Sequence, residues 1–227
     1  MSLVSILKSL LTVCVFTIPP VSFVESYTCV NSTCVNRECT PTLGVCETSR
    51  GCFSRVQEFR MPAVFSNTIT TQQKGCAADA CTDLAFSVTL DFWMFRYEQR
   101  CCQAEQCNKP VSSLSQPSSQ ANGVQCPTCY NDQDMSCDPA PLNCTGAETE
   151  CIIFMGKAFG NYPQSVLFGK GCATETACNL NMSAFDTLKI QTLCTSGSPP
   201  RTSVSAVTPS LFLLPSLALI VQAPGIL

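Results

Sequence analysis

The chain has 227 residues, a formal net charge of −3, 19 cysteines and no histidine. The lack of histidine removes the commonest general base and the commonest metal ligand, and no motif pairs a serine or a carboxylate with a base. We therefore expect no enzyme, no metal site and no cofactor. The many cysteines in so short a chain predict a disulfide-stabilised, extracellular protein.

The N-terminal residues 1–26 predict a secretory signal. Lys8 precedes an apolar run over residues 10–18, and Val24 and Ser26 fit the positions before a cut after Ser26. A retained signal anchor is the alternative, which the shortness of the run disfavours. Cys14 would leave with the signal, so 18 of the 19 cysteines remain, an even number that predicts no free thiol.

The mature chain is predicted to hold two copies of one module. Residues 27–109 contain ten cysteines and residues 126–196 contain eight, with the long gaps between cysteines in the same places. Residues 110–125, which are rich in Ser, Pro and Gln, predict a linker. The first module has eight basic and eight acidic residues, and the second has three basic and seven acidic. This balance argues against a nucleic-acid partner.

The long gaps between cysteines predict β-hairpins. Residues 84–90 alternate apolar with small or polar side chains, Asp91 and Phe92 break the phase, and the apolar side chains from Trp93 to Tyr97 take the opposite parity. This pattern predicts a hairpin that returns to Cys101. Residues 151–155 and 165–168 predict a second hairpin, and residues 184–193 alternate less cleanly. No long stretch has a helical period, so we expect an all-β fold.

The first module ends Cys101-Cys102-Gln103-Ala104-Glu105-Gln106-Cys107-Asn108, with a double cysteine, a four-residue gap and a Cys-Asn close. This ending, and the matching Lys-Gly-Cys sequences at 74–76 and 170–172, resemble the Ly-6/uPAR family. The resemblance covers residues 27–194 and implies two disulfide-rich three-finger domains of the snake-toxin-like kind. Two departures stand out: the second module lacks the final bridge and asparagine, and the first cysteine gap is wider than is usual in the family.

Spacing alone leaves many disulfide connectivities open. The resemblance implies five bridges in the first module and four in the second. They are Cys29–Cys52, Cys34–Cys39, Cys46–Cys76, Cys81–Cys101, Cys102–Cys107, Cys126–Cys151, Cys129–Cys137, Cys144–Cys172 and Cys178–Cys194. Cys126 and Cys129 form a Cys-x-x-Cys motif, but no second pair with zinc spacing accompanies it, so a structural role is favoured.

The C-terminal residues 197–227 predict a glycosylphosphatidylinositol (GPI) attachment signal. Small residues at Ser196, Gly197 and Ser198 compete as the attachment site, with Ser203 and Ser205 as alternatives. A polar spacer and an apolar tail interrupted by proline follow. A spanning helix needs ~20 apolar residues, which this tail lacks. A secreted form without an anchor is the alternative.

Three sequons, at Asn31, Asn143 and Asn181, predict glycosylation, and Asn143 is the weakest because Cys144 must also form a bridge. The candidate partner-binding residues, at the expected tip of the third finger, are Phe92, Trp93, Phe95 and Arg96. Either these aromatic residues pack on the sheet, or Phe92 and Trp93 are exposed anchors rimmed by Asp91, Arg96 and Arg100. A weaker counterpart in the second module comprises Phe159, Tyr162 and Phe168.

The family resemblance implies a GPI-anchored, non-catalytic protein that binds an extracellular protein ligand through its finger tips and the groove between the modules. The alternative is a secreted inhibitor of an extracellular enzyme such as phospholipase A2. A glycan-bearing structural component of the cell coat is a third interpretation. The sequence leaves the ligand and the oligomeric state open.

Overall fold

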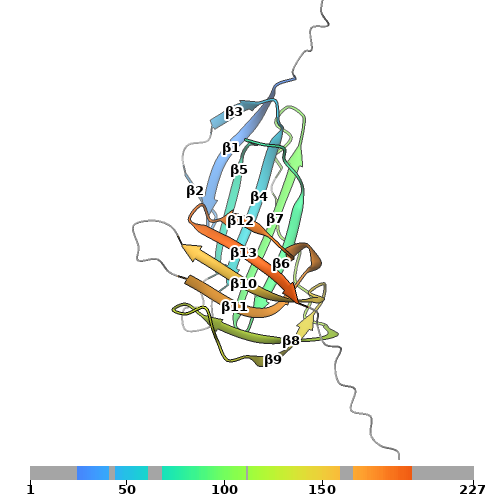
Figure 1. Ribbon diagram of the computed structural model, residues 1–227. Coiled ribbons are helices and arrows are strands. Elements are labelled where there is room, and N and C mark those ends of the chain that lie inside the picture. Colours follow the sequence, from blue (N-terminus) through green and yellow to red (C-terminus); the bar gives the residue numbers. More distant parts are fainter. Residues whose placement is uncertain (1–24, 41–43, 61–67, 111, 159–165, 196–227) are drawn as a thin grey trace, which may run out of the picture.

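The computed structural model describes residues 25–40, 44–60, 68–110, 112–158 and 166–195, and these residues are almost entirely β-structure (Figure 1). The strands are β1 (Tyr27–Val35), β2 (Glu38–Cys39), β3 (Gly44–Thr48), β4 (Cys52–Arg60), β5 (Thr68–Cys76), β6 (Leu84–Leu90), β7 (Trp93–Cys102), β8 (Ala121–Asn131), β9 (Ala140–Thr145), β10 (Glu150–Ala158), β11 (Val166–Ala173), β12 (Asn181–Ala184) and β13 (Leu188–Thr195). One 3-10 turn, η1 (Glu175–Ala177), is the sole helical segment of the described residues. The all-β prediction is confirmed.

The predicted hairpin from residue 84 to Cys101 is confirmed by β6 and β7. These strands pair in register from Leu84↔Gln99 to Leu90↔Trp93, which leaves Asp91 and Phe92 as the turn. Asp91 has a φ of 53°, a left-handed conformation that aspartate tolerates better than most residues. The phase break in the sequence is therefore the turn itself.

The second module contains a similar central hairpin, in which β10 pairs with β11, and the tip between them, residues 159–165, lies outside the described residues. The weak alternation over residues 184–193 has a local cause. Phe185 and Asp186 have φ values of 49° and 58°, so the chain turns there and the segment divides into β12 and β13.

The second module also begins earlier along the chain than the sequence indicated. Strand β8 starts at Ala121, inside the predicted linker 110–125. The side-chain amide of Asn122 donates hydrogen bonds to the carbonyl oxygens of Gly146 (3.1 Å) and Glu148 (2.9 Å), which fixes this start against the second module. Turn-forming residues such as Asn122 and Gly123 resembled a linker because they carry no alternating pattern.

The two modules join in one sheet. The strand order is β12-β13-β10-β11-β6-β7-β4-β5-β1-β2, with β3 on β1 and the β8–β9 hairpin on β11. The junction is the pairing of β11 with β6, at Cys172↔Thr89 and Ala173↔Val88. Figure 1 shows β10, β11 and β13 crossing the strands of the first module, with the start of β1 and the end of β13 at opposite ends of the molecule.

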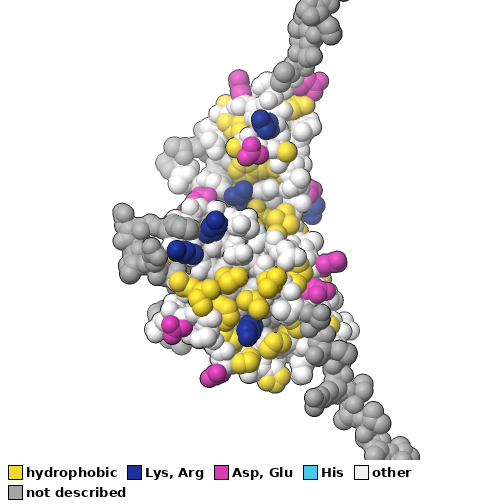
Figure 2. Space-filling model, viewed as in Figure 1, with side chains coloured by type: hydrophobic (Ala, Val, Ile, Leu, Met, Phe, Trp, Pro, Cys, Tyr) yellow, Lys and Arg dark blue, Asp and Glu magenta, His cyan; other side chains and the backbone are white. Residues whose placement is uncertain are grey.

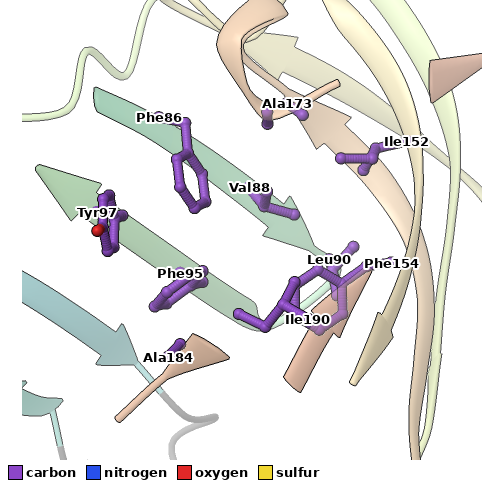
Figure 3. Packing of buried hydrophobic residues seen from close by; sticks show 11 residues of the cluster. Phe86, Val88, Leu90, Phe95, Tyr97, Ile152, Phe154, Ala173, Ala184 and Ile190 are labelled. Carbon is purple, nitrogen blue, oxygen red and sulfur yellow. The ribbon is translucent and has the colours of Figure 1, made fainter. Parts of the chain in front are cut away.

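A common hydrophobic core lies between the modules (Figure 3). The first module contributes side chains of β6 and β7, and the second contributes side chains that include those of β10 and β13. The buried members are Phe86, Val88, Leu90, Phe95, Tyr97, Ile152, Phe154, Ala173, Ala177, Ala184 and Ile190. Because burying a large apolar side chain stabilises by about 1.5–3 kcal/mol, this cluster holds the two modules in a fixed arrangement.

No helix among the described residues has the length and apolar character needed to cross a membrane.

Candidate functional site

The disulfides shape the fingers on which any site must be built. The structure brings together the sulfur atoms of the same nine pairs that the resemblance implies, 1.97 to 2.20 Å apart. Every one of these bridges lies within a single module. The two cysteines of the Cys-x-x-Cys motif bond to different partners, Cys126 to Cys151 and Cys129 to Cys137. Neither therefore offers a thiolate to a metal.

The tip of the third finger in the first module is docked against the second module. The backbone N–H of Asp91 donates a hydrogen bond to Thr128 Oγ1 (2.6 Å). The Trp93 ring stacks on Tyr130, with ring centroids 4.4 Å apart, and also contacts Phe59 at 4.8 Å. Thr128 and Tyr130 flank Cys129 without any alternating pattern, so no feature of the sequence signals this contact.

This docking corrects part of the predicted binding surface. Phe95 is 4 % exposed and lies in the common core, and Arg96 is 8 % exposed on the opposite face of β7. Neither is available as an exposed anchor, because the second module covers one face of the hairpin and an ion pair takes up Arg96 on the other. Trp93 is half-buried. Phe92, at 70 % exposed, is the one large apolar side chain of the four that faces solvent.

The three residues of the predicted polar rim, Asp91, Arg96 and Arg100, also divide into exposed and buried members. Asp91 is exposed at the turn. Arg100 is exposed and pairs with Glu98 (3.0 Å) and Asp83 (3.4 Å), whereas Arg96 pairs with Glu58 (3.3 Å) and is buried. Arg100 and Asp91 thus remain available at the surface, on two separate parts of the hairpin.

A groove of about 370 Å³ runs between the modules on the outer side of β6 and β7. Its walls are the strands β6 and β7, residues 114–118 of the linker, and residues 145–148 at the end of β9 and in the turn that follows. Arg96 lines one wall and Glu148 the other. The linker part of this wall was not predicted, because its Ser- and Pro-rich composition indicated only an unstructured connection.

Glu148 is the most unusual titratable group of the groove, at 7 % exposed. Its carboxylate accepts hydrogen bonds from Ser87 Oγ (2.7 Å) and Thr89 Oγ1 (3.1 Å), which belong to the other module. Burial raises the pKa of this carboxyl, against the opposing effects of the two hydroxyl groups and of the Arg96 charge. Outside the groove, at the contact with Trp93, burial together with the charge of Asp132 raises the pKa of Tyr130 to about 12. The groove therefore offers hydrogen-bond donors and acceptors fixed by both modules.

The three sequon asparagines, Asn31, Asn143 and Asn181, are exposed on β1, β9 and β12. Several other sequence predictions lie outside the described residues: residues 1–24 of the signal, the attachment candidates Ser196, Gly197, Ser198, Ser203 and Ser205, and the aromatic residues Phe159 and Tyr162. Phe168, in β11, is largely buried.

Comparison with known proteins finds relatives that match most of the chain. It is 44% identical over 227 residues to Protein RoBo-1 of Rattus norvegicus, which covers 94% of this chain and 93% of that protein. It is 29% identical over 147 residues to the phospholipase A2 inhibitor 25 kDa subunit of Naja kaouthia, covering 62% and 79% of the two chains. The crystal structure of mouse TEX101 aligns at a TM-score of 0.36 and 18% identity over 76% of this chain and 99% of that chain. Residues 24–110 and 122–199 both match the u-PAR/Ly-6 domain. The chain belongs to the u-PAR/Ly-6 domain family.

Proposed function

We propose that this protein is a GPI-anchored, non-catalytic binding protein on the extracellular face of the plasma membrane, which takes a protein ligand in the groove between its modules. The observation that carries the proposal is the groove itself, whose two walls are held in place by one sheet and one core. A preorganised groove binds with little loss of conformational entropy. Membership of a family of non-catalytic domains supports a binding role, and the exposed Phe92 adds an apolar anchor beyond the groove.

Filling the groove tests ligand binding there. Ala147 is exposed on the groove wall, so Ala147→Trp places an indole in the space that a ligand would occupy. Ala78→Trp makes the same change at an exposed loop outside the groove. A cell-surface ligand captured by cross-linking to the intact ectodomain should lose at least about tenfold in affinity with Ala147→Trp only. Equal binding of both variants would remove the groove from the proposal.

Treatment of expressing cells with a phosphatidylinositol-specific phospholipase C tests the anchor. The proposal expects surface staining to fall and the protein to appear in the medium. Protein that is soluble before treatment contradicts the tethered form. Surface protein that resists the enzyme would require a different attachment.

A secreted phospholipase A2 inhibitor is the second candidate function. It is favoured by the relative from Naja kaouthia, a phospholipase A2 inhibitor subunit of which the alignment covers 79%. Titration of a secreted phospholipase A2 with the purified protein is the discriminating assay. Loss of enzyme activity at a stoichiometric dose would favour this function over ligand binding at an anchored surface.

A further inference from the structure

Strand β10 carries apolar side chains on both of its faces. Ile152 and Phe154 point into the common core, while Ile153 and Met155 are half-buried on the opposite face. A strand with one face open to water normally alternates apolar with polar residues, and a continuous apolar run is typical of a strand covered on both sides. The outer face of β10 therefore has the composition of a covered surface.

Strand pairing extends this outer face across three strands. Ile153 lies between Leu193 of β13 and Lys170 of β11 in the first row. Met155 lies between Gln191 and Phe168 in the second row, and Lys157 lies between Lys189 and Val166 in the third. We name these nine residues the lysine face: Ile153, Met155, Lys157, Val166, Phe168, Lys170, Lys189, Gln191 and Leu193.

The lysine face is partly open to solvent: Lys157, Lys189, Gln191 and Leu193 are exposed, Ile153, Met155, Val166 and Lys170 are half-buried, and Phe168 is buried. Figure 2 shows hydrophobic side chains gathered over β10, β11 and β13, with basic side chains beside them. Leu193 is 49 % exposed and pairs with Ile153 of β10, just beyond the part of β13 that β12 covers. Neighbouring apolar side chains that remain partly exposed on a folded domain indicate an interaction site.

The charge of this face is opposite to that of its module. Lys157, Lys170 and Lys189 are the only basic residues between positions 126 and 196, and all three lie on the face. None of its nine positions is acidic, and the neighbouring positions on β8 (Cys129, Asn131) and β12 (Asn181, Ser183) are uncharged. Asp132 and Asp134 follow the end of β8 at Asn131. Within the described part of the chain, no salt bridge involves Lys170 or Lys189.

The first module provides an internal comparison, because Cys52 and Cys76 there correspond to Cys151 and Cys172. The nine equivalent positions are Ser54, Val56, Glu58, Thr70, Gln72, Lys74, Arg96, Glu98 and Arg100. One of these residues is apolar, whereas the lysine face has five. Two acids balance the basic residues in the first module, and none does so in the second. The apolar and cationic character is thus particular to the second module.

The first module also shows what kind of segment covers such a face. Ser112 Oγ is 2.7 Å from Ser54 Oγ, and Lys74 Nζ donates hydrogen bonds to the carbonyl oxygens of Lys109 and Pro110 at 2.8 Å each. Residues 114–118 continue past Arg96 and Glu98 as a wall of the groove. An extended piece of chain therefore runs along the strands of the first module.

We propose that the lysine face docks an extended, acidic segment of a partner protein, in the way that the linker lies along the first module. This inference rests on the proposed protein-binding function and adds the chemistry of the partner. Leu193, Ile153 and Met155 form the apolar seat, and the lysines lie at its two ends. The chain after Thr195 contains no acidic residue, so it does not complement these lysines.

The row spacing sets the sequence pattern of the partner. Lys170 lies in the first row and Lys157 with Lys189 in the third, four residues apart along a strand, which is about 13 Å. An extended segment that runs along the strands would meet them with acids at positions i and i+4 and an apolar residue at i+2. A fluorescent peptide of three Asp-Ser-Leu-Ser repeats and a final Asp carries this pattern and serves as the probe.

The experiment measures binding of this probe to the intact exported protein by fluorescence anisotropy. The probe should bind saturably, and replacing its Leu by Ser or its Asp by Lys should weaken binding at least about tenfold. The protein variant Lys170→Glu with Lys189→Glu should show a similar loss. The matched variant Arg37→Glu with Arg50→Glu, which reverses two exposed charges in the first module, should stay within about twofold. Hydrogen exchange should show new protection in β10 and β13.

Equal binding of the probe to both charge-reversal variants, or protection that maps elsewhere, would overturn the proposal. If the protein forms a dimer and the variant Lys170→Glu with Lys189→Glu is monomeric, the face binds a second copy of this chain. Protection that is present in the free protein and lost on truncation after Thr195 would assign it to the C-terminal segment, and either result overturns the partner. The probe tests this face alone, so a failure of the probe to bind does not contradict ligand binding in the groove. In the same way, the Ala147→Trp result does not test the lysine face.

Discussion

At the residue scale, Asn108 joins three strands of the first module. It is 3 % exposed, its Oδ1 accepts the Val30 N–H at 2.9 Å, and its Nδ2 donates to the carbonyl oxygens of Val30 (2.9 Å), Phe53 (3.0 Å) and Gly75 (3.5 Å), in β1, β4 and β5. Only an amide combines one carbonyl acceptor with two donors in this geometry. The Cys-Asn ending was the most specific signal of the sequence, yet spacing could not show which strands the amide connects.

The variant Asn108→Asp should lower the free energy of unfolding by about 2–4 kcal/mol, because a buried carboxylate would face the carbonyl oxygens that now accept hydrogen bonds. Urea unfolding with intact disulfides measures the loss. Gln133→Glu makes the same chemical change at an exposed position and should shift stability by less than about 0.5 kcal/mol. Equal stability of the two variants would contradict the role assigned to Asn108.

Glu148 should make stability fall as pH rises. Burial raises its pKa in the folded protein, so in the weakly acidic range above the ordinary glutamate pKa the folded state binds more protons than the unfolded state. The stabilisation is fully present below the unfolded pKa and is lost as pH rises through the folded pKa. Glu148→Gln should flatten this pH dependence in urea titrations, whereas Glu47→Gln, at an exposed position, should leave it unchanged. Parallel curves for Glu148→Gln and the parent would refute this coupling.

At the scale of the element, the hairpin of β6 and β7 shows how much structure the alternation of apolar and polar residues can predict. The phase break at Asp91 predicted the turn and the two faces of the strands. It could not predict that the second module buries one of those faces, because period-two alternation shows that a face is covered without showing what covers it. Arg96 lies on the opposite face, and its ion pair with Glu58 of β4 left no pattern in the sequence.

Trp93→Ala should therefore destabilise the protein by about 3–5 kcal/mol, since it removes the ring that stacks on Tyr130. Phe92→Ala, one residue away and exposed, should change stability by less than about 0.5 kcal/mol. Secretion yield and urea unfolding would both report the difference. A stable Trp93→Ala protein would make this residue a candidate surface anchor again.

Strand β11 approaches β6 closely because it carries glycine at its core face. A Cβ on Gly171 would overlap the carbonyl oxygen of Thr89, and backbone cannot move aside as a side chain can. Gly171→Ala should cost at least about 2 kcal/mol and speed proteolysis within the linker. Gly44→Ala, in a strand position with open space, is the matched control. Similar cleavage rates in the two variants would argue against this junction.

At the scale of the whole molecule, composition and cysteine spacing predicted two all-β modules, and both expectations about fold class and family hold. The common core was not predicted, because a cluster that unites residues as distant in the sequence as Phe86 and Ile190 leaves no local pattern. The sequence indicated a groove between the modules, and the structure places a groove there, on the outer side of a shared sheet.

The common core predicts a single unfolding transition. Trp93 is the only tryptophan and lies at the contact between the modules, so its fluorescence reports their docking. Fluorescence and far-ultraviolet circular dichroism should give coincident urea curves. A fluorescence change that precedes the loss of β-structure would show that the modules separate before they unfold.

The placement of the disulfides has a mechanical consequence. Each of the nine bridges closes a loop inside one module, so disulfides reinforce the modules and leave their joint to side-chain packing, hydrogen bonds and two strand-pairing positions. The start of β1 and the end of β13 lie at opposite ends of the molecule, so a load applied between them passes through that joint. Under tension the two modules would separate first. The molecule would then lengthen while the loops closed by disulfides remained closed.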